Sequence, residues 1–253
     1  MINLNRSTYQ YKCQPCNDSE IRKMIIELAE KYIRFGSPRI HALLRRKGIK
    51  INHKKTERIY KEENLSLRTK KHKKKLPEIR IKMPQATEPN EVWSMDFMFD
   101  KLFIGNRFKI LTIVNDYSKV CPGLEVAGSI TGSHVTRFLD QISAFYGYPK
   151  RIRVDNGPEF RCKEFVLWAM EKNIKIEYTR PGTPTDNALI ESFNGKLRDE
   201  CLNQTVFKNI KGSREIIETW RTFYNDVRPH STLGYCTPKE YLKKFEKLTL
   251  KVA

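Results

Sequence analysis

Residues 92–99 read VWSMDFMF, so that Asp96 stands in the middle of an otherwise mostly apolar and aromatic run. Such a run is typical of a buried β-strand, where an aspartate is disfavoured and its charge needs a partner. A second strand is expected at Phe108–Asp116, with Gly105–Asn106 at the turn between the two, and a third at Val120–Val126. Asp96 is therefore a candidate functional residue.

Beyond residue 130 the apolar periodicity alternates between that of a helix and that of a strand. Three early strands followed by this alternation predict an α/β fold, a mixed sheet with helices on its faces. The expected elements are a helix at Thr131–Tyr146, a strand at Arg151–Asp155, a helix at Cys162–Asn173, a strand at Ile174–Tyr178, and helices at Asn187–Cys201 and Ser213–Asn225.

Two further acids are candidate functional residues because of their positions. Asp155 ends an expected strand and is followed at once by the sharp turn Asn156–Gly157, and strand ends are where α/β proteins place their functional groups. Glu191 lies in the first turns of the helix that follows a loop rich in Pro, Gly and Thr. Taken singly, each acid could equally be a capped turn or a satisfied surface charge.

Convergence of the three acids would need cations, because three unneutralised carboxylates repel one another. An all-oxygen ligand set suits hard ions such as Mg²⁺ or Mn²⁺. Two such ions, about 3.5–4 Å apart, can activate an attacking oxygen and stabilise a leaving one in phosphodiester chemistry. We therefore expect Asp96, Asp155 and Glu191 to hold two Mg²⁺ ions, with Mn²⁺ able to substitute.

The charge is distributed unevenly along the chain. Lys and Arg number 48 against 29 acids, a net charge of +19. Residues 1–82 hold 23 basic and 8 acidic residues, whereas residues 83–253 hold 25 and 21. A basic first third suggests a module that neutralises phosphates, rather than a surface that is merely soluble.

Residues 18–64 predict three helices: Glu20–Phe35 with Asp18 or Ser19 as the N-cap, Arg39–Lys47, and a third capped by Asn52 that ends near Asn64. Two short helices joined by a tight turn containing Gly make a helix-turn-helix candidate. The basic tract Arg68–Lys75 is expected to be a linker. The residues expected to contact DNA are Lys54, Lys55 and Arg58 on the third helix, and Arg39 and Arg45 on the second.

The six cysteines are better explained as reduced thiols than as a disulfide framework, since no secretory signal is apparent. Only Cys13 and Cys16 have metal-ligand spacing, and no second close pair completes a zinc site. No apolar run approaches the roughly 20 residues that span a bilayer. These features predict a cytoplasmic protein without a membrane partner.

Three motifs carry a resemblance to a known family: VWSMD at 92–96, VDNGPEF at 154–160 and DNALIESF at 186–193, with 35 residues between Asp155 and Glu191. The sequence resembles the insertion-sequence transposases of the family numbered three, whose integrase core is related to retroviral integrases. The resemblance extends to residues 39–54, which look like that family's helix-turn-helix, and to residues 224–238.

The resemblance implies an RNase H-like catalytic core preceded by an all-α helix-turn-helix module. Asp96 would lie on the first strand, Asp155 just past the fourth and Glu191 on a following helix, as the metal-binding catalytic set of a DDE-type transposase. Arg198, Asn194 and Lys196 would contact DNA. The implied domains are an arm (1–17), the helix-turn-helix module (18–66), a basic linker (67–90), the core (91–205) and a C-terminal helical extension (206–253).

The implied activity is metal-dependent cleavage at transposon ends, followed by transfer of the freed 3′-hydroxyl to target DNA. The implied partners are double-stranded DNA, further copies of the chain and the product of a first reading frame, at the bacterial nucleoid. The alternatives are a retroviral-type integrase, a metal-dependent nuclease, and a DNA-binding regulatory or partner-dependent subunit without autonomous catalysis. The roles of Arg228 and His230 stay open, with packing of the tail against the core slightly favoured.

Overall fold

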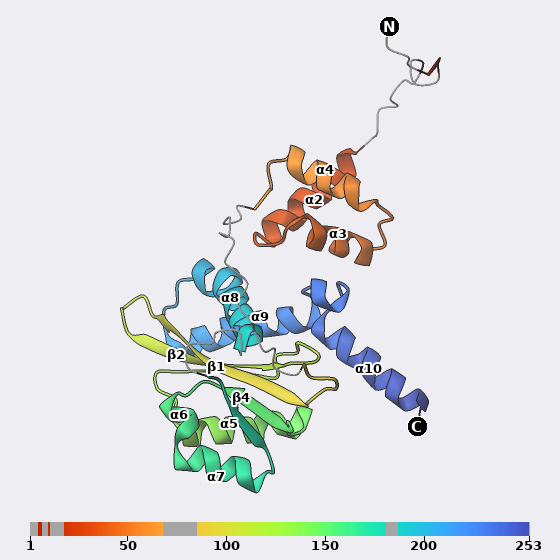
Figure 1. Cartoon of the computed structure of the whole chain (residues 1–253). Helices are drawn as coiled ribbons and strands as arrows, with labels where there is room; N and C mark the ends of the chain where they lie inside the picture. Colours follow the sequence, from red (N-terminus) through yellow and green to blue (C-terminus); the bar gives the residue numbers. More distant parts are fainter. Residues whose placement is uncertain (1–4, 7–9, 11–17, 68–84, 181–186, 253) are drawn as a thin grey trace. The chain divides into compact units, whose positions relative to one another are not determined.

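The computed structural model describes residues 5–6, 10, 18–67, 85–180 and 187–252, and the chain divides into two compact units, Met1–Lys70 and Lys71–Ala253 (Figure 1). Three features of the sequence analysis lie outside the described residues: the Cys13–Cys16 pair, the basic tract 68–75 and the loop 181–186. Among the described helices, none combines the length and the apolar character needed to cross a membrane.

The first unit contains the three predicted helices, α2 (Ser19–Lys31), α3 (Ser37–Arg46) and α4 (His53–Glu62). The predicted cap of α4 is confirmed, since the Asn52 side chain accepts a hydrogen bond of 3.0 Å from the Lys54 N–H. The N-cap position of α2 is Asp18, one of the two predicted candidates, but the predicted C-terminal end at Phe35 was wrong. Asp18 makes no capping hydrogen bond, and the helix stops at Lys31 because Phe35 folds back into the core, where its carbonyl accepts the Tyr60 hydroxyl.

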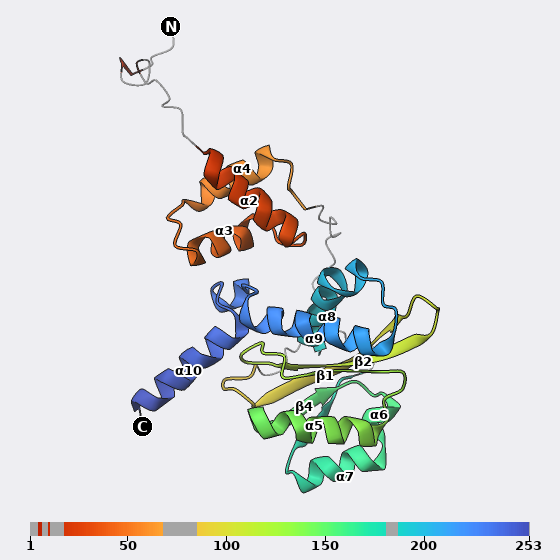
Figure 2. The same ribbon diagram turned by 180° about the vertical axis from the view of Figure 1, so that it is seen from behind.

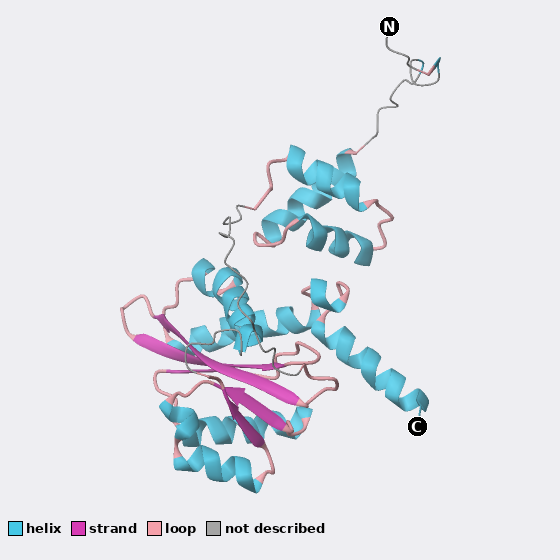
Figure 3. Ribbon diagram, viewed as in Figure 1, coloured by secondary structure: helices cyan, strands magenta, loops and turns pink. Residues whose placement is uncertain are grey.

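The second unit is built on a five-stranded mixed sheet in the order β3-β2-β1-β4-β5 (Figure 3). The strand β1 pairs antiparallel with β2 and parallel with β4, so it lies at the centre of the sheet. The predicted α/β class is therefore confirmed. The strands are β1 (Val92–Lys101), β2 (Arg107–Asn115), β3 (Leu124–Ala127), β4 (Arg151–Val154) and β5 (Lys175–Tyr178).

Helices cover both faces of this sheet, as Figures 1 and 2 show. Alternate residues of β1 serve the two faces: Trp93 and Met95 pack under α5, α6 and α7, whereas Met98 packs under α8 and α9. The helices are α5 (Gly132–Tyr146), α6 (Pro158–Arg161), α7 (Lys163–Glu171), α8 (Ala188–Glu200), α9 (Ile210–Asp226) and α10 (Pro238–Val252).

Two boundaries differ from expectation for tertiary reasons. The third strand begins at Leu124 rather than Val120, because Cys121 exchanges hydrogen bonds with the Asn225 side chain of α9 instead of a neighbouring strand. The short helix α6 was not expected. Pro158 can occupy the first turn of a helix, where its missing N–H costs nothing, and Phe160 is buried against the sheet.

Candidate active site

Asp96 lies on β1, on the face of the sheet that α8 covers. One carboxylate oxygen accepts the Phe97 N–H at 2.8 Å, and the other accepts the side-chain amide of Asn194 on α8 at 2.7 Å. The pKa of Asp96 is raised to about 6: partial burial is the largest cause, the negative charges of Asp155 and Glu191 add to it, and the two hydrogen bonds oppose it. The second and third predicted acids therefore lie close enough to act on the first.

Asp155 follows directly after β4, the parallel neighbour of β1. In the register Ser94 lies opposite Arg153, so the same register continued by two residues puts Asp155 beside Asp96. The Gly157 N–H donates to the Asp155 carboxylate at 3.0 Å. A Cβ atom on residue 157 would lie 2.9 Å from that same oxygen, so a larger residue there would displace the Asp155 carboxylate from its present position.

Glu191 lies in the first turn of α8, and its side chain is exposed. Its neighbours Ile190 and Phe193 are fully buried in the core beneath α8 and α9, which fixes the helix and turns Glu191 outward. Strand, strand end and helix thus contribute one acid each. Within the described residues the three carboxylates do not form a closed cluster of metal ligands.

The three residues of α8 that were predicted to contact DNA differ in their surroundings. Asn194 is buried, and its side-chain amide donates to Asp96. Within the described residues, its side-chain oxygen has no hydrogen-bond partner. Arg198 donates to the Phe99 carbonyl of β1 at 3.2 Å, and the Lys196 ammonium lies 3.0 Å from the Ser192 hydroxyl. The structure therefore places Asn194 as a support for Asp96, whereas Arg198 and Lys196 remain partly exposed.

An ion pair on the opposite face supports the turn that carries Asp155. Lys109 of β2 pairs with Glu159 of α6, and its ammonium lies 3.8 Å from the centre of the Phe97 ring. Phe97 in turn stacks on Phe160 at 4.9 Å. The pair therefore joins β2 to α6, the helix that begins directly after the Asp155–Gly157 turn. Sequence reasoning missed it, although a lysine within a buried strand was a detectable signal.

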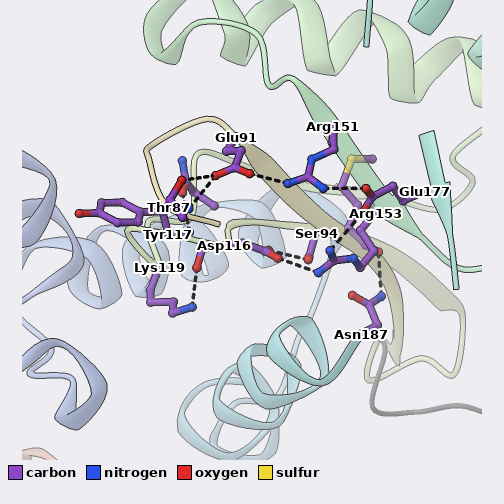
Figure 4. A network of polar contacts seen from close by, with 12 residues as sticks. Thr87, Glu91, Ser94, Asp116, Tyr117, Lys119, Arg151, Arg153, Glu177 and Asn187 are labelled. Carbon is purple, nitrogen blue, oxygen red and sulfur yellow. Dashed lines mark hydrogen bonds and ion pairs between the residues drawn. The ribbon is translucent and has the colours of Figure 1, made fainter. Parts of the chain in front are cut away.

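Figure 4 shows a second ionic network, which includes Ser94 and Arg153. Ser94 lies two residues before Asp96 on the same face of β1 and opposite Arg153 of β4. Arg153 of β4 is 5% exposed and donates to Asp116 at 2.9 Å and to Glu177 of β5 at 3.1 Å. Asp116 also accepts the Ser94 hydroxyl at 2.6 Å, and its burial raises its pKa. The network joins the strands that carry Asp96 and Asp155 immediately before those acids.

Comparison with known proteins identifies the family. The integrase core domain matches residues 86–184, a second integrase core domain matches residues 172–238, and an HTH-like domain matches residues 16–74. A 31.7 kDa protein of insertion element IS407 from Burkholderia multivorans is 40% identical over 96% of this chain and 88% of its own length. The chain belongs to the insertion-sequence transposases with an integrase core.

Other relatives agree with this assignment. A protein of insertion element IS476 from Xanthomonas euvesicatoria is 39% identical over 97% of this chain and 71% of its own length. The putative transposase InsK of IS150 from Escherichia coli is 26% identical over 93% of this chain and 89% of its own. The transposase assignment expected from the three motifs is thereby confirmed.

Solved structures confirm the RNase H-like fold of the core. The HTLV-2 integrase catalytic core domain in complex with magnesium superimposes with a TM-score of 0.50 at 22% identity, over 62% of this chain and 98% of that chain. A chain of the simian T-cell lymphotropic virus intasome in complex with PP2A regulatory subunit B56 gamma gives 0.55 at 17% identity, over 86% and 74%.

In the first unit of this transposase, the basic residues of α4 are partly neutralised. Lys55 and Arg58 pair with the buried Asp18 at 2.6 and 2.7 Å, and Arg58 also pairs with Glu62 at 2.7 Å. Lys54 is exposed. On α3, Arg45 is exposed, while Arg39 donates to the Arg34 carbonyl and lies over the Phe35 ring.

The residues Arg228 and His230, whose roles the sequence left open, pack inside the core unit. Arg228 is 1% exposed and holds Glu200, the last residue of α8, with three contacts of 2.7–3.1 Å. The His230 ring packs edge-on against Tyr224 at 4.8 Å. Arg228 therefore anchors the far end of the helix that carries Glu191, while His230 packs against α9.

Proposed function

We propose that Asp96, Asp155 and Glu191 are the catalytic carboxylates of a DDE-type transposase and that they bind two divalent metal ions. The ions are Mg²⁺ in the cell, and Mn²⁺ can replace them. The reaction is cleavage at the transposon ends, followed by attack of the freed 3′-hydroxyl on target DNA. The observation that carries this proposal is geometric: Asp96 on β1, Asp155 directly after the neighbouring strand β4 and Glu191 in the first turn of α8, which packs on β1 through the Asn194–Asp96 hydrogen bond.

The chemistry of the side chains fits hard divalent cations. All three candidate ligands are carboxylates, which suit Mg²⁺ and Mn²⁺. A cation between them would relieve the repulsion that contributes to the raised pKa of Asp96 and would favour its charged form. When bound, two such ions activate the attacking oxygen and stabilise the leaving oxygen of a phosphodiester.

The chain's own residues orient these carboxylates. Asn194 donates to one oxygen of Asp96, which leaves the other oxygen, held only by the adjacent Phe97 N–H, with lone pairs free for a cation. The Gly157 N–H holds Asp155 in the same way. Such supporting hydrogen bonds fix the direction of a ligand before the metal arrives.

The proposed substrate is double-stranded DNA, both transposon ends and target. Exposed Lys54 and Arg45 of the first unit, with Arg198 and Lys196 of α8, are the residues we propose as DNA contacts, and Lys55, Arg58 and Arg39 would join them on rearrangement of their present partners. Because cutting two ends requires two active sites, the working form is a homo-multimer on DNA at the nucleoid. The product of a first reading frame is a further proposed partner.

The test is nicking of supercoiled DNA in the presence of Mg²⁺ or Mn²⁺. We expect the native chain to nick, and Asp155→Asn and Glu191→Gln to lose nicking while they still bind DNA. Glu215→Gln is the matched control, because it removes another exposed helical carboxylate, on α9. Nicking that persists in both site variants would refute the carboxylate assignment. Absence of nicking by the native chain, with DNA binding intact, would favour a partner-dependent or regulatory subunit.

A further inference from the structure

The hairpin between β1 and β2 ends in a turn that presents large apolar side chains to solvent. Phe103 is 79% and Ile104 is 69% exposed. The preceding Leu102 is buried in the core, and the turn closes with hydrogen bonds from Leu102 to Asn106 and from Gly105 to Leu102. Gly105 has a φ of 91°, a conformation that glycine adopts without strain. The backbone therefore fixes Phe103 and Ile104 outward.

A second segment of the chain extends this exposed surface. The Phe103 N–H donates to the Phe207 carbonyl at 2.7 Å, and Phe207 itself is buried edge-on against Phe108. The neighbouring Val206 is 69% exposed. Figures 1 and 2 both show the hairpin turn beside the connection from α8 to α9. We call Phe103, Ile104 and Val206 the hairpin-tip patch.

Basic residues surround the hairpin-tip patch. Lys101 and Arg107 face each other across the two strands at the base of the turn, and Lys208 follows the Val206 segment. All three are exposed, and none forms an ion pair with another residue of the described part of the chain. This differs from α4, where Lys55 and Arg58 are held by acids. The rim of the patch thus offers unpaired positive charge.

Phe103 and Ile104 follow shortly after the end of β1, the strand that carries Asp96. Phe103 comes seven positions after Asp96, a span of at most about 23 Å at the rise of a β-strand, or about seven base pairs of DNA. Between them, Arg198 of α8 contacts the Phe99 carbonyl. The catalytic acid, the predicted DNA contact on α8 and the hairpin-tip patch therefore follow one another along β1.

We propose that the hairpin-tip patch binds DNA, with Phe103 and Ile104 wedged against the bases while Lys101, Arg107 and Lys208 contact flanking phosphates. Apolar side chains flanked by cations are the chemistry by which proteins unstack a base step. A second copy of this chain suits the rim less well, because it would bring further positive charge to it. This inference depends on the proposed function only for where the reacting phosphodiester lies.

The experiment measures binding of the full chain to a labelled duplex in EDTA, over a series of salt concentrations, together with permanganate reactivity of unstacked thymines. For Phe103→Ala combined with Ile104→Ala, we expect about tenfold weaker binding with an unchanged salt slope, and loss of the reactive thymines. For Lys101→Gln, Arg107→Gln and Lys208→Gln together, we expect the salt slope to fall by about one for each contact.

Phe145→Ala is the matched control, because Phe145 is the exposed aromatic residue of α5 on the helical layer across the sheet. Wild-type binding and reactivity in the double alanine variant would overturn the proposal. So would a loss of self-association in sedimentation with DNA affinity unchanged, which would assign the patch to a protein contact. Because the experiment is done in EDTA, its outcome does not depend on whether the three carboxylates bind metal. Asp155→Asn should therefore keep the reactive thymines.

Discussion

Asn194 connects the helix that carries Glu191 to the strand that carries Asp96. Its amide donates to the Asp96 carboxylate at 2.7 Å, and its side chain is buried. Asn194 comes three positions after Glu191, so one turn of α8 both presents an acid and orients another. Asn194 therefore acts on the proposed reaction indirectly, by orienting the carboxylate of Asp96.

We predict that Asn194→Ala lowers the nicking rate by about 10- to 100-fold, because Asp96 loses the donor that orients it. DNA affinity should stay within about twofold of the native value. Raising the metal concentration should restore part of the rate, which a general loss of folding would not allow. The measurement is a titration of nicking against Mn²⁺ at saturating DNA.

A fall in DNA affinity, with the metal dependence unchanged, would contradict this prediction and support the direct DNA contact that the sequence suggested for Asn194. Ser192→Ala is a suitable control on the same helix, because Ser192 is exposed and its hydroxyl lies against Lys196 rather than Asp96.

At the scale of elements, ionic contacts on opposite faces of the sheet hold the end of β4 on which Asp155 lies. Arg153 joins β4 to Asp116 and β5 on the α8 side, and Lys109 joins β2 to α6 on the other side. The cost of removing two charges from water offsets most of their attraction, so these contacts fix geometry more than they add net stability. Breaking such a pair is nevertheless destabilising, because it leaves one charge buried without its partner.

For the Lys109–Glu159 pair we predict that Lys109→Met and Glu159→Gln each destabilise the chain by about 1–3 kcal/mol. The exchange of Lys109→Glu with Glu159→Lys should recover part of the loss in a double-mutant cycle measured by urea unfolding. The exposed pair Lys150–Glu88 is the control, and its coupling should be much smaller because solvent screens it. Equal coupling in the two pairs would show that the buried pair does not fix α6.

The contact of Asp18 with α4 predicts how the first unit responds to acid. Hydrogen bonds from Lys55 and Arg58 hold the pKa of Asp18 below its ordinary value. A lowered folded-state pKa gives stability that is present above the unfolded pKa of about 3.9, and that is lost as the pH falls through the folded value. We therefore expect this unit to loosen at acid pH.

The measurement follows the methyl resonances of Ile40 and Ile59, both fully buried in the first unit, as the pH of the full chain is lowered. In Asp18→Asn this part of the pH dependence should disappear. Glu20→Gln, which removes an exposed acid two residues along the same helix, should keep it. A pH response that is the same in Asp18→Asn and the native chain would show that other groups cause it.

The elements that the sequence predicted are those with local signals. Asn52 and Thr131 cap α4 and α5 as side chains that hydrogen-bond their own helix, and such caps can be found from sequence alone. The partners of Arg153 and Lys109 could not be found from sequence, because they come from distant strands and helices. The same holds for Lys55 and Arg58, whose partner Asp18 lies across the first unit.

At the scale of the whole molecule, two units with separate cores share one chain. Ile25, Ile40 and Ile59 form the centre of the first core, while the second has apolar layers on both faces of its sheet. The candidate acids all belong to the second unit. Their convergence could be predicted because the three motifs keep family spacing, whereas the support from Asn194 needed the fold.

We predict that residues 85–253 alone nick supercoiled DNA with Mn²⁺, since all three acids and their supports lie within them. Their affinity for DNA should be lower than that of the full chain, and the salt slope smaller, because 23 of the 48 basic residues lie before residue 83. Fluorescence anisotropy at several salt concentrations, beside a nicking assay, tests this. An unchanged salt slope would remove the first unit from DNA binding.

The clamp between Arg228 and Glu200 also sets an order of assembly during synthesis. Asp96, Asp155 and Glu191 have all left the peptidyl-transferase centre before Arg228 is added, and α8 lacks that clamp until then, although Trp220 and Tyr224, against which it packs, are added earlier. In a nascent chain, the first unit and the three acids are therefore synthesised before α8 is held by Arg228. We therefore expect the first unit to fold during translation, before the helix that carries Glu191 is fixed.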